Sequence, residues 1–249
     1  IQVSILNNVN NKNARKTSQV LLDQAINIIE KNQQSEKELI QSLKEDYIVR
    51  AKAVSYIIDA LPEAEYDVEE LQKIADLMSI DEIHLFDNSG TIYSGSVPKY
   101  YGYSFRSGEQ MAYFTPMLSD KSLTMCQDVT PNTSEGKKMM YAITWNESGD
   151  RMIQVGIEPV RLLEKVKQNE VSTIVSNMPM YEGISLYVAD IDTGEIYGAT
   201  DRTKIGQTLE DIGLSKKQLS SGKETIDTVT IDNEKCSCIF ESSGSYEVG

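Results

Sequence analysis

The first 60 residues carry hydrophobic side chains at helical spacing. Apolar residues recur three, four or seven positions apart from Val20 to Leu61, and Lys, Glu, Gln and Asn occupy most of the positions between them. Neither Gly nor Pro occurs before Pro62. This pattern predicts one long amphipathic helix, with Asn32 to Ser35 as the place where it would break. Its apolar stripe is too irregular for a strict coiled-coil seam.

After Pro62 the pattern changes to short helices and strands. Asp67 as an N-cap predicts a helix over 68–78, and the run Glu82 to Phe86 predicts a strand. Further strands are predicted at 91–94, 123–129, 139–145 and 152–157, and further helices at 109–118 and 160–178. Pro116 is expected to shorten the helix that contains it. This order predicts an α+β module with a single antiparallel sheet.

A weak internal repeat predicts a second module of the same kind. Residues 85–105 and 187–209 both have an apolar strand, an Asp-rich turn ending in Gly, Ile-Tyr with a small residue, and a later Gly (Gly102, Gly206). An apolar residue follows three positions on (Phe105, Leu209). The predicted parts are a long helix at 1–61, a first module at 62–157 and a second at 158–249. We expect the last strand of the second module to be cut short at Gly249.

The charge balance excludes two classes of partner. The 249 residues include 24 basic and 38 acidic side chains, a formal charge of −14. Nucleic acid requires clusters of Lys and Arg, and so does docking on an anionic lipid surface, so neither is expected. No run of about 18 apolar residues occurs, so no membrane-spanning helix is predicted.

The residues form no catalytic or metal-binding pattern, so neither an enzyme nor a cofactor is predicted. His84 is the single histidine, and we expect a structural or surface role for it. The segment 190–195 imitates the start of a calcium loop but lacks the closing ligands, so a hairpin turn is predicted. Cys236 and Cys238 are expected to be buried strand thiols on one face, and their redox state is left open.

The repeat also carries a family resemblance. The arrangement of strand, D-x-x-G-x-I-Y, small residue and I-G-Q at 186–207 resembles the Cache (PAS-like, PDC) signature. A long N-terminal helix followed by two such blocks resembles the double Cache sensors. The segments GEQMAYFTPML, CQDVTPNT and VGIEPVRLLEKVKQNE are similar to those of sensors fused to diguanylate cyclases in anaerobic Firmicutes.

This resemblance implies the extracytoplasmic sensor part of a bacterial transmembrane receptor. In that family the long helix leaves the membrane, the first module is membrane-distal and the second returns the chain to the membrane. The output domain, whether a cyclase, a histidine kinase or a chemoreceptor, is left open. A free solute-binding protein and a surface protein without a ligand remain alternatives.

A ligand site is predicted in the first module, where aromatic residues gather at 100–114. Arg106 would bind a carboxylate or phosphate, and Asp128 opposite it would bind an amine. The predicted site residues are Tyr101, Phe105, Arg106, Tyr113, Phe114, Asp128, Tyr141 and Trp145. Together they suit an amino acid or small carboxylate. The alternative is that these aromatics form a core and that Arg106 lies in solvent.

Three further expectations concern the ligand class, the second module and a homodimer. Amino-acid-binding Cache domains have Trp and Tyr close after the Arg, whereas Ser107 and Gly108 follow Arg106, so the ligand class stays open. The second module is expected to relay rather than bind. The long helix would be the element with two states, and it is compatible with a parallel homodimer.

Overall fold

The computed structural model describes residues 2–7, 12–215, 225–231 and 234–242. The chain divides into two compact units. We call Lys37–Leu163 the mid-chain unit, and Ile1–Glu36 together with Glu164–Gly249 the terminal unit. The strand end expected at Gly249 lies outside the described residues. Within the described residues, no helix is both long and apolar enough to cross a bilayer.

Helix α1 (Lys12–Ala60) is continuous, so the break expected at Asn32 to Ser35 does not occur. No Gly or Pro interrupts this stretch, and its polar residues are compatible with helix. Each unit uses a different part of the helix. Leu21, Leu22, Ala25 and Ile29 are buried in the terminal unit, and Tyr47, Ala51, Val54 and Ile58 in the mid-chain unit.

The mid-chain unit contains one antiparallel sheet in the order β3-β2-β7-β6-β4. Its strands are β2 (Glu82–Phe86), β3 (Ile92–Gly95), β4 (Thr124–Cys126), β6 (Lys138–Trp145) and β7 (Met152–Ile157), and the short β5 (Thr130–Pro131) also pairs with β6. The sequence predicted the position of every longer strand. The α+β fold is therefore confirmed for this unit.

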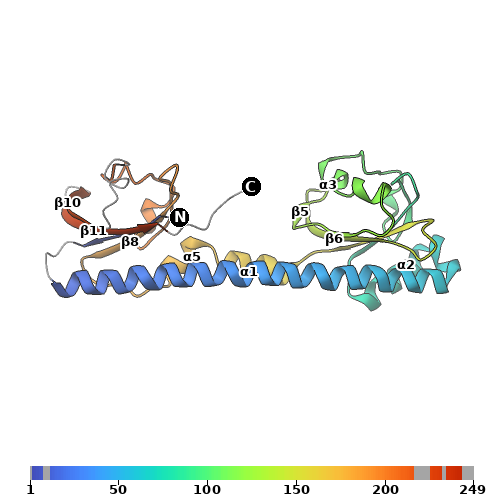
Figure 1. Cartoon of the computed structure of the whole chain (residues 1–249), viewed down its shortest axis with the longest axis horizontal. Helices are drawn as coiled ribbons and strands as arrows, with labels where there is room; N and C mark the ends of the chain where they lie inside the picture. The colour runs from blue at the N-terminus through green and yellow to red at the C-terminus, as the bar shows by residue number, and fades with distance from the viewer. Residues whose placement is uncertain (1, 8–11, 216–224, 232–233, 243–249) are drawn as a thin grey trace. The chain divides into compact units, whose positions relative to one another are not determined.

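Helices and loops cover both faces of this sheet. Helices α1 and α2 (Val68–Met78) lie on one face, and α3 (Glu109–Ala112) lies on the other (Figure 1). Asp67 caps α2 as predicted, because its Oδ1 accepts hydrogen bonds from the backbone N–H groups of Glu69 and Glu70 at 2.9 and 3.0 Å. The helix predicted over 109–118 is split into α3 and the 3₁₀ turn η3 (Thr115–Leu118), which contains Pro116. The remaining 3₁₀ turns of the unit are η1 (Pro62–Tyr66) and η2 (Pro98–Tyr100).

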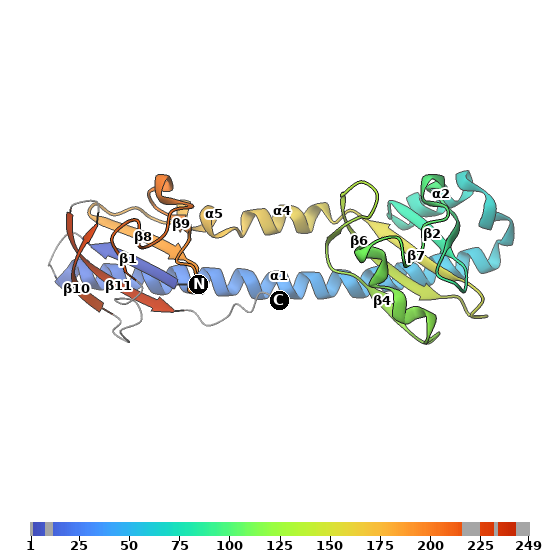
Figure 2. The ribbon, with the colours of Figure 1, turned by 90° about the horizontal axis from the view of Figure 1, so that it is seen from above.

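The terminal unit has a five-stranded sheet in the order β10-β11-β1-β8-β9 (Figure 2). Its elements are β1 (Gln2–Asn7), α5 (Val171–Ser176), β8 (Ile184–Ala189), β9 (Ile196–Ala199), the 3₁₀ turn η4 (Arg202–Lys204), β10 (Thr225–Ile231) and β11 (Glu234–Ser242). Helix α4 (Val160–Gln168) begins in the mid-chain unit and ends in the terminal unit. Strand β1 pairs with both β8 and β11. These first residues fall within the segment 1–61 that was predicted as a long helix, and they form a strand instead.

The internal repeat is visible in the backbone hydrogen bonds. The N–H of Phe105 donates to the carbonyl of Gly90 at 3.0 Å, and the N–H of Leu209 donates to that of Gly194 at 2.9 Å. Gly102 and Gly206 occupy equivalent turn positions with φ of 86° and 85°, a left-handed conformation that favours glycine. The strand orders correspond as well, with β1 in the terminal unit at the position that β7 has in the mid-chain unit.

Candidate functional site

A small cavity lies on the face of the mid-chain sheet that is turned away from α1. Its volume is about 30 Å³, which is room for one or two water molecules. It is lined by His84, Ile92, Tyr100, Tyr103, Gln110, Met111, Asn132, Thr133, Ser134, Tyr141 and Gln154. We call it the sheet-face pocket.

The floor of the pocket is built by three neighbouring strands. His84 on β2 pairs with Gln154 on β7, and Tyr141 on β6 pairs with Gly156 on β7. Because alternate residues of a strand share a face, these side chains stand on the same side of the sheet. A Cβ at Gly156 would lie 2.6 Å from Cε1 of Tyr141, so the ring needs a glycine beneath it. The sheet therefore holds the polar groups in fixed positions.

A buried carboxylate lies beside this floor. Oε2 of Glu82 accepts hydrogen bonds from the Tyr141 hydroxyl at 3.0 Å and from Nε2 of His84 at 3.1 Å. All three residues are buried. Burial by itself would raise the pKa of Glu82, but the hydrogen bonds from His84 and Tyr141 outweigh it, and the pKa is lowered. Glu82 is therefore ionised at neutral pH. Burial raises the pKa of Tyr141, so its hydroxyl remains a donor.

His84 is left with an unused hydrogen-bonding atom. Its Nε2 faces the Glu82 carboxylate, so the hydrogen lies on Nε2 and Nδ1 is an acceptor in the neutral ring. Nδ1 is buried and has no hydrogen-bond partner among the described residues. An unpartnered polar atom in a protein interior costs about 1–3 kcal/mol, so it calls for an explanation. A donor supplied by a ligand would provide one.

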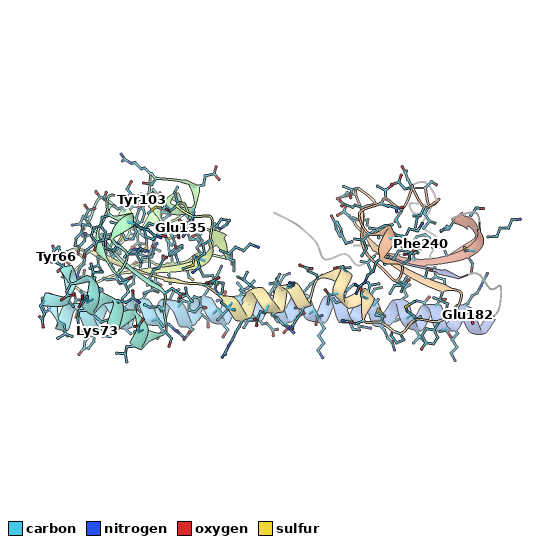
Figure 3. The ribbon with its side chains drawn as sticks, turned by 180° about the vertical axis from the view of Figure 1, so that it is seen from behind. Tyr66, Lys73, Tyr103, Glu135, Glu182 and Phe240 are labelled. Carbon is cyan, nitrogen blue, oxygen red and sulfur yellow. The ribbon has the colours of Figure 1, made fainter. Side chains whose placement is uncertain are left out.

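Loop residues cover the pocket. Nδ2 of Asn132 lies 3.5 Å from the Tyr100 hydroxyl, which donates to Oε2 of Glu135 at 3.2 Å. Glu135 also pairs with Lys99, whose Nζ lies 4.9 Å from the centroid of the Tyr100 ring. Figure 3 shows Tyr103 and Glu135 on the side of the sheet away from α1. We call residues 99–103 and 132–135 the lid.

The predicted site residues are distributed over three environments. Tyr141 alone among the eight lines the pocket. Phe105, Phe114 and Trp145 belong to the buried cluster on the same sheet face, and Nε1 of Trp145 donates to the carbonyl of Met117 at 3.0 Å. These three match the alternative that the aromatics form a core.

The other four predicted residues lie at the surface. Tyr101 and Tyr113 are partly exposed, and their hydroxyls donate to the carbonyls of Gly95 and Cys126. Arg106 is exposed and does not line the pocket. Asp128 forms an ion pair with Lys44 of α1 at 2.7 Å. The structure therefore does not pair Asp128 with Arg106.

Two polar residues of the floor, His84 and Gln154, are not among the predicted site residues. His84 was expected to have a structural or surface role, and it is buried in β2 beside Glu82, where it also lines the cavity. Both lie in a strand whose five residues are all buried. Gln154 was passed over although it stands alone among apolar residues in Met152–Ile157. A polar residue inside a buried strand is the signal that would have found them. The described residues contain no group of three or more potential metal ligands.

Comparison with known proteins gives structural neighbours only. No family model and no curated protein sequence matches the chain. The sensory domain of the Campylobacter jejuni chemoreceptor Tlp3 with isoleucine bound has 11% identity and a TM-score of 0.44, over 94% of this chain and 98% of that one. An extracellular ligand binding receptor from Desulfohalobium retbaense has 13% identity and a TM-score of 0.40, over 84% of this chain. The match spans only 39% of that receptor.

A third neighbour is the sensor domain of Escherichia coli DcuS. Its identity is 14% and its TM-score 0.33, over 50% of this chain and 97% of that one. At identities and TM-scores this low, function has to be inferred from this chain's own residues.

Proposed function

We propose that this chain is a non-catalytic sensor domain that binds a small molecule in the sheet-face pocket. The carrying observation is the unpartnered Nδ1 of His84, buried at a cavity whose floor also presents Gln154 and Tyr141. Binding sites combine apolar and aromatic walls with a few placed polar groups, and rigid strands hold such groups well. The pocket has this composition.

Ligand binding would displace the lid. The cavity of about 30 Å³ is too small for most metabolites, so the lid has to move outwards to admit one. The two parts of the lid are held differently. Backbone hydrogen bonds tie residues 102 and 103 to Ile92, whereas 132–135 is held to other parts of the unit by side-chain contacts that include the half-exposed Lys99–Glu135 pair. Exposed ion pairs contribute little to stability, so we expect 132–135 to move first. Binding would thereby cause a conformational change in the lid.

The change would reach α1 through the sheet. In β2, His84 points into the pocket, while its neighbours Ile83 and Leu85 are buried on the opposite face, where α1 lies (Figure 1). Buried residues of α1 in this unit include Val54 and Ile58. A ligand that binds one arrangement of the sheet more tightly would increase the population of that arrangement, and with it the position of α1 that belongs to it.

The cellular context is proposed from the resemblance to double Cache sensors. In this proposal the chain is the extracytoplasmic part of a transmembrane receptor, which tethers it to the membrane. The pocket would then lie in the membrane-distal module. A parallel homodimer would form along α1. Apolar segments of about 20 residues encoded on both sides of residues 1–249, with an output domain beyond, are expected. A gene without them would favour a free solute-binding protein.

A ligand screen tests the binding function. The single Trp145 lies in the mid-chain unit, so its fluorescence reports the unfolding of that unit. We expect at least one compound among amines, amino acids, carboxylates and sugars to raise its unfolding temperature. Gln154→Leu keeps the volume of the side chain and should abolish the shift. Arg106→Ala should preserve it.

Each other outcome has a definite meaning. A shift lost in Arg106→Ala and retained in Gln154→Leu would place the ligand at the site predicted from the sequence. A screen in which no compound raises the unfolding temperature would contradict ligand sensing and favour a structural surface protein.

A further inference from the structure

The residues that line the sheet-face pocket carry no positive side chain of Lys or Arg. The ionised carboxylate of Glu82 lies directly behind His84 and Tyr141. Lys99, whose Nζ lies 4.9 Å from the centroid of the Tyr100 ring, is paired with Glu135, and Lys137 is paired with Glu158. The formal charge of the chain is −14, which attracts cations from a distance.

The walls of the pocket are aromatic. Tyr100, Tyr103 and Tyr141 contribute three phenol rings. His84 packs edge-on against Tyr100 with ring centroids 5.4 Å apart, and Tyr100 and Tyr103 lie 6.0 Å apart. The faces of such rings attract cations, an interaction of about 0.5–2 kcal/mol. Both the aromatic rings and the carboxylate of Glu82 therefore favour a positively charged ligand.

The polar atoms favour a cation that carries N–H groups. Nδ1 of His84 is an acceptor without a partner, and the amides of Gln154 and Asn132 also line the cavity. A quaternary ammonium has no hydrogen to donate to them, whereas a primary ammonium has three. Because the closed cavity holds about 30 Å³, the smallest amines need the least displacement of the lid.

A ligand that carries a carboxylate would be disfavoured in this pocket. It would be buried beside an ionised carboxylate, with no cationic side chain lining the cavity to compensate its charge. Carboxylate ligands normally engage Arg or Lys, and Arg106 is exposed outside this pocket. The arrangement therefore disfavours acids, and amino acids with them.

We infer that the ligand of the sheet-face pocket is a small primary amine, bound as its ammonium ion and carrying no carboxylate. This inference rests on the proposed sensing function and names its ligand class. The ammonium lies between the rings of Tyr100 and Tyr141 and donates to Nδ1 of His84. Glu82 supplies the compensating negative charge.

Four two-carbon probes of nearly equal size test the ligand charge. Ethanolamine is a cation, ethylene glycol is neutral, glycolate is an anion and glycine is a zwitterion. We expect ethanolamine to bind the wild-type chain at least tenfold more tightly than the other three in titration calorimetry. Glu82→Gln should weaken ethanolamine binding at least tenfold, and Arg106→Ala should leave it unchanged.

A second variant keeps the test valid if Glu82→Gln fails to fold. Thr133 lines the pocket from an exposed lid position, so Thr133→Lys adds a positive charge without disturbing the core. It should abolish ethanolamine binding by repulsion. Thr133→Gln is the neutral control of similar length and should keep at least a third of the affinity.

The remaining outcomes overturn the inference. Equal binding of ethylene glycol would show that charge is not recognised, and tighter binding of glycolate or glycine would show that a carboxylate is. Either result leaves the sensing function standing. Binding of none of the four probes would reject a small amine, while the broader ligand screen decides separately whether the domain senses anything.

Discussion

The two units build the same sheet and fill its pocket face differently. Glu82 and Tyr141 both pair with Gly156, and Ser185 and Cys238 both pair with Leu6. His84 pairs with Gly95 of β3, as Tyr187 pairs with Ala199 of β9. Ser185, Tyr187 and Cys238 are therefore the terminal-unit equivalents of Glu82, His84 and Tyr141.

The difference separates a binding face from a packing face. In the terminal unit, Tyr187 and Cys238 belong to a buried cluster with Ile196, Leu209 and Phe240. In the mid-chain unit, His84 and Tyr141 occupy the equivalent positions, and both form hydrogen bonds with the buried, ionised carboxylate of Glu82. Buried polar groups lower stability unless all their bonds are made, so their presence in only one of two similar faces indicates a function for that face.

The first prediction uses one buried cysteine in each unit. Burial raises the pKa of both Cys126 and Cys238 to about 12. Their thiolate fractions near pH 8 are therefore roughly a thousandfold below that of an ordinary thiol. Peptide mass spectrometry should show both to be alkylated by iodoacetamide at least about a hundredfold more slowly than the partly exposed Cys236.

A ligand then distinguishes the two faces. A compound that binds the sheet-face pocket should slow the alkylation of Cys126 further, because it stabilises only the mid-chain unit, and leave Cys238 unchanged. Equal slowing of both thiols would mean that the ligand does not distinguish the units.

The second prediction concerns Arg151, which ties β7 to other parts of the mid-chain unit. It pairs with Asp59 of α1 and, at 2.7 Å, with Glu65. The Arg151 side chain is only 16% exposed. Arg151→Ala leaves two partly buried carboxylates without their cation, so we expect a loss of about 2–4 kcal/mol in the free energy of unfolding. Urea unfolding followed by Trp145 fluorescence measures it.

A matched variant controls for the loss of a positive charge. Lys73 forms an exposed pair with Glu70 on α2 of the same unit, and Lys73→Ala should leave the urea midpoint unchanged. Equal midpoints for Arg151→Ala and Lys73→Ala would show that the buried network contributes no stability.

The third prediction removes one donor from Glu82. Tyr141→Phe deletes the hydroxyl that donates to the carboxylate and leaves the ring in place. We expect the mid-chain unit to lose about 1–2 kcal/mol, since hydrogen bonds to charged groups are stronger than average. Tyr113→Phe loses only a partly exposed bond to the carbonyl of Cys126, and it should change stability by less than about 0.5 kcal/mol. Equal losses in both variants would contradict a special role for Glu82.

The sequence predicted the scaffold far better than the site. Strands at Glu82–Phe86 and Met152–Ile157 and the Asp67 cap follow from local patterns, and these are correct. Strand β1 escaped prediction because its pairing partners, β8 and β11, lie almost the full length of the chain away. Local periodicity contains no information about such long-range pairing.

The site depends on tertiary contacts for the same reason. Aromatic density at 100–114 does not tell which rings face a cavity, so it does not separate Phe105 and Phe114, which lie in the core, from Tyr100 and Tyr103, which line the pocket. Arg106 was chosen for its charge and is exposed. The spacing of Glu82 and His84 on one strand was readable, but the third member, Tyr141, joins them only through the order of strands in the sheet.

The smallest expected effect is the pH dependence that Glu82 gives to the mid-chain unit alone. Its pKa is lower in the folded chain than in the unfolded one, so ionised Glu82 contributes stability at pH values above about 4.3, the unfolded value. That contribution is lost as the pH falls through the folded pKa. The stability difference between wild type and Glu82→Gln, followed by Trp145 fluorescence, should therefore shrink by less than about 1 kcal/mol from about pH 6 to about pH 3.

The equivalent residue in the terminal unit, Ser185, does not titrate. A difference that grows on acidification would mean that Glu82 is protonated in the folded chain, and the pocket would then lack the negative charge that separates the two faces.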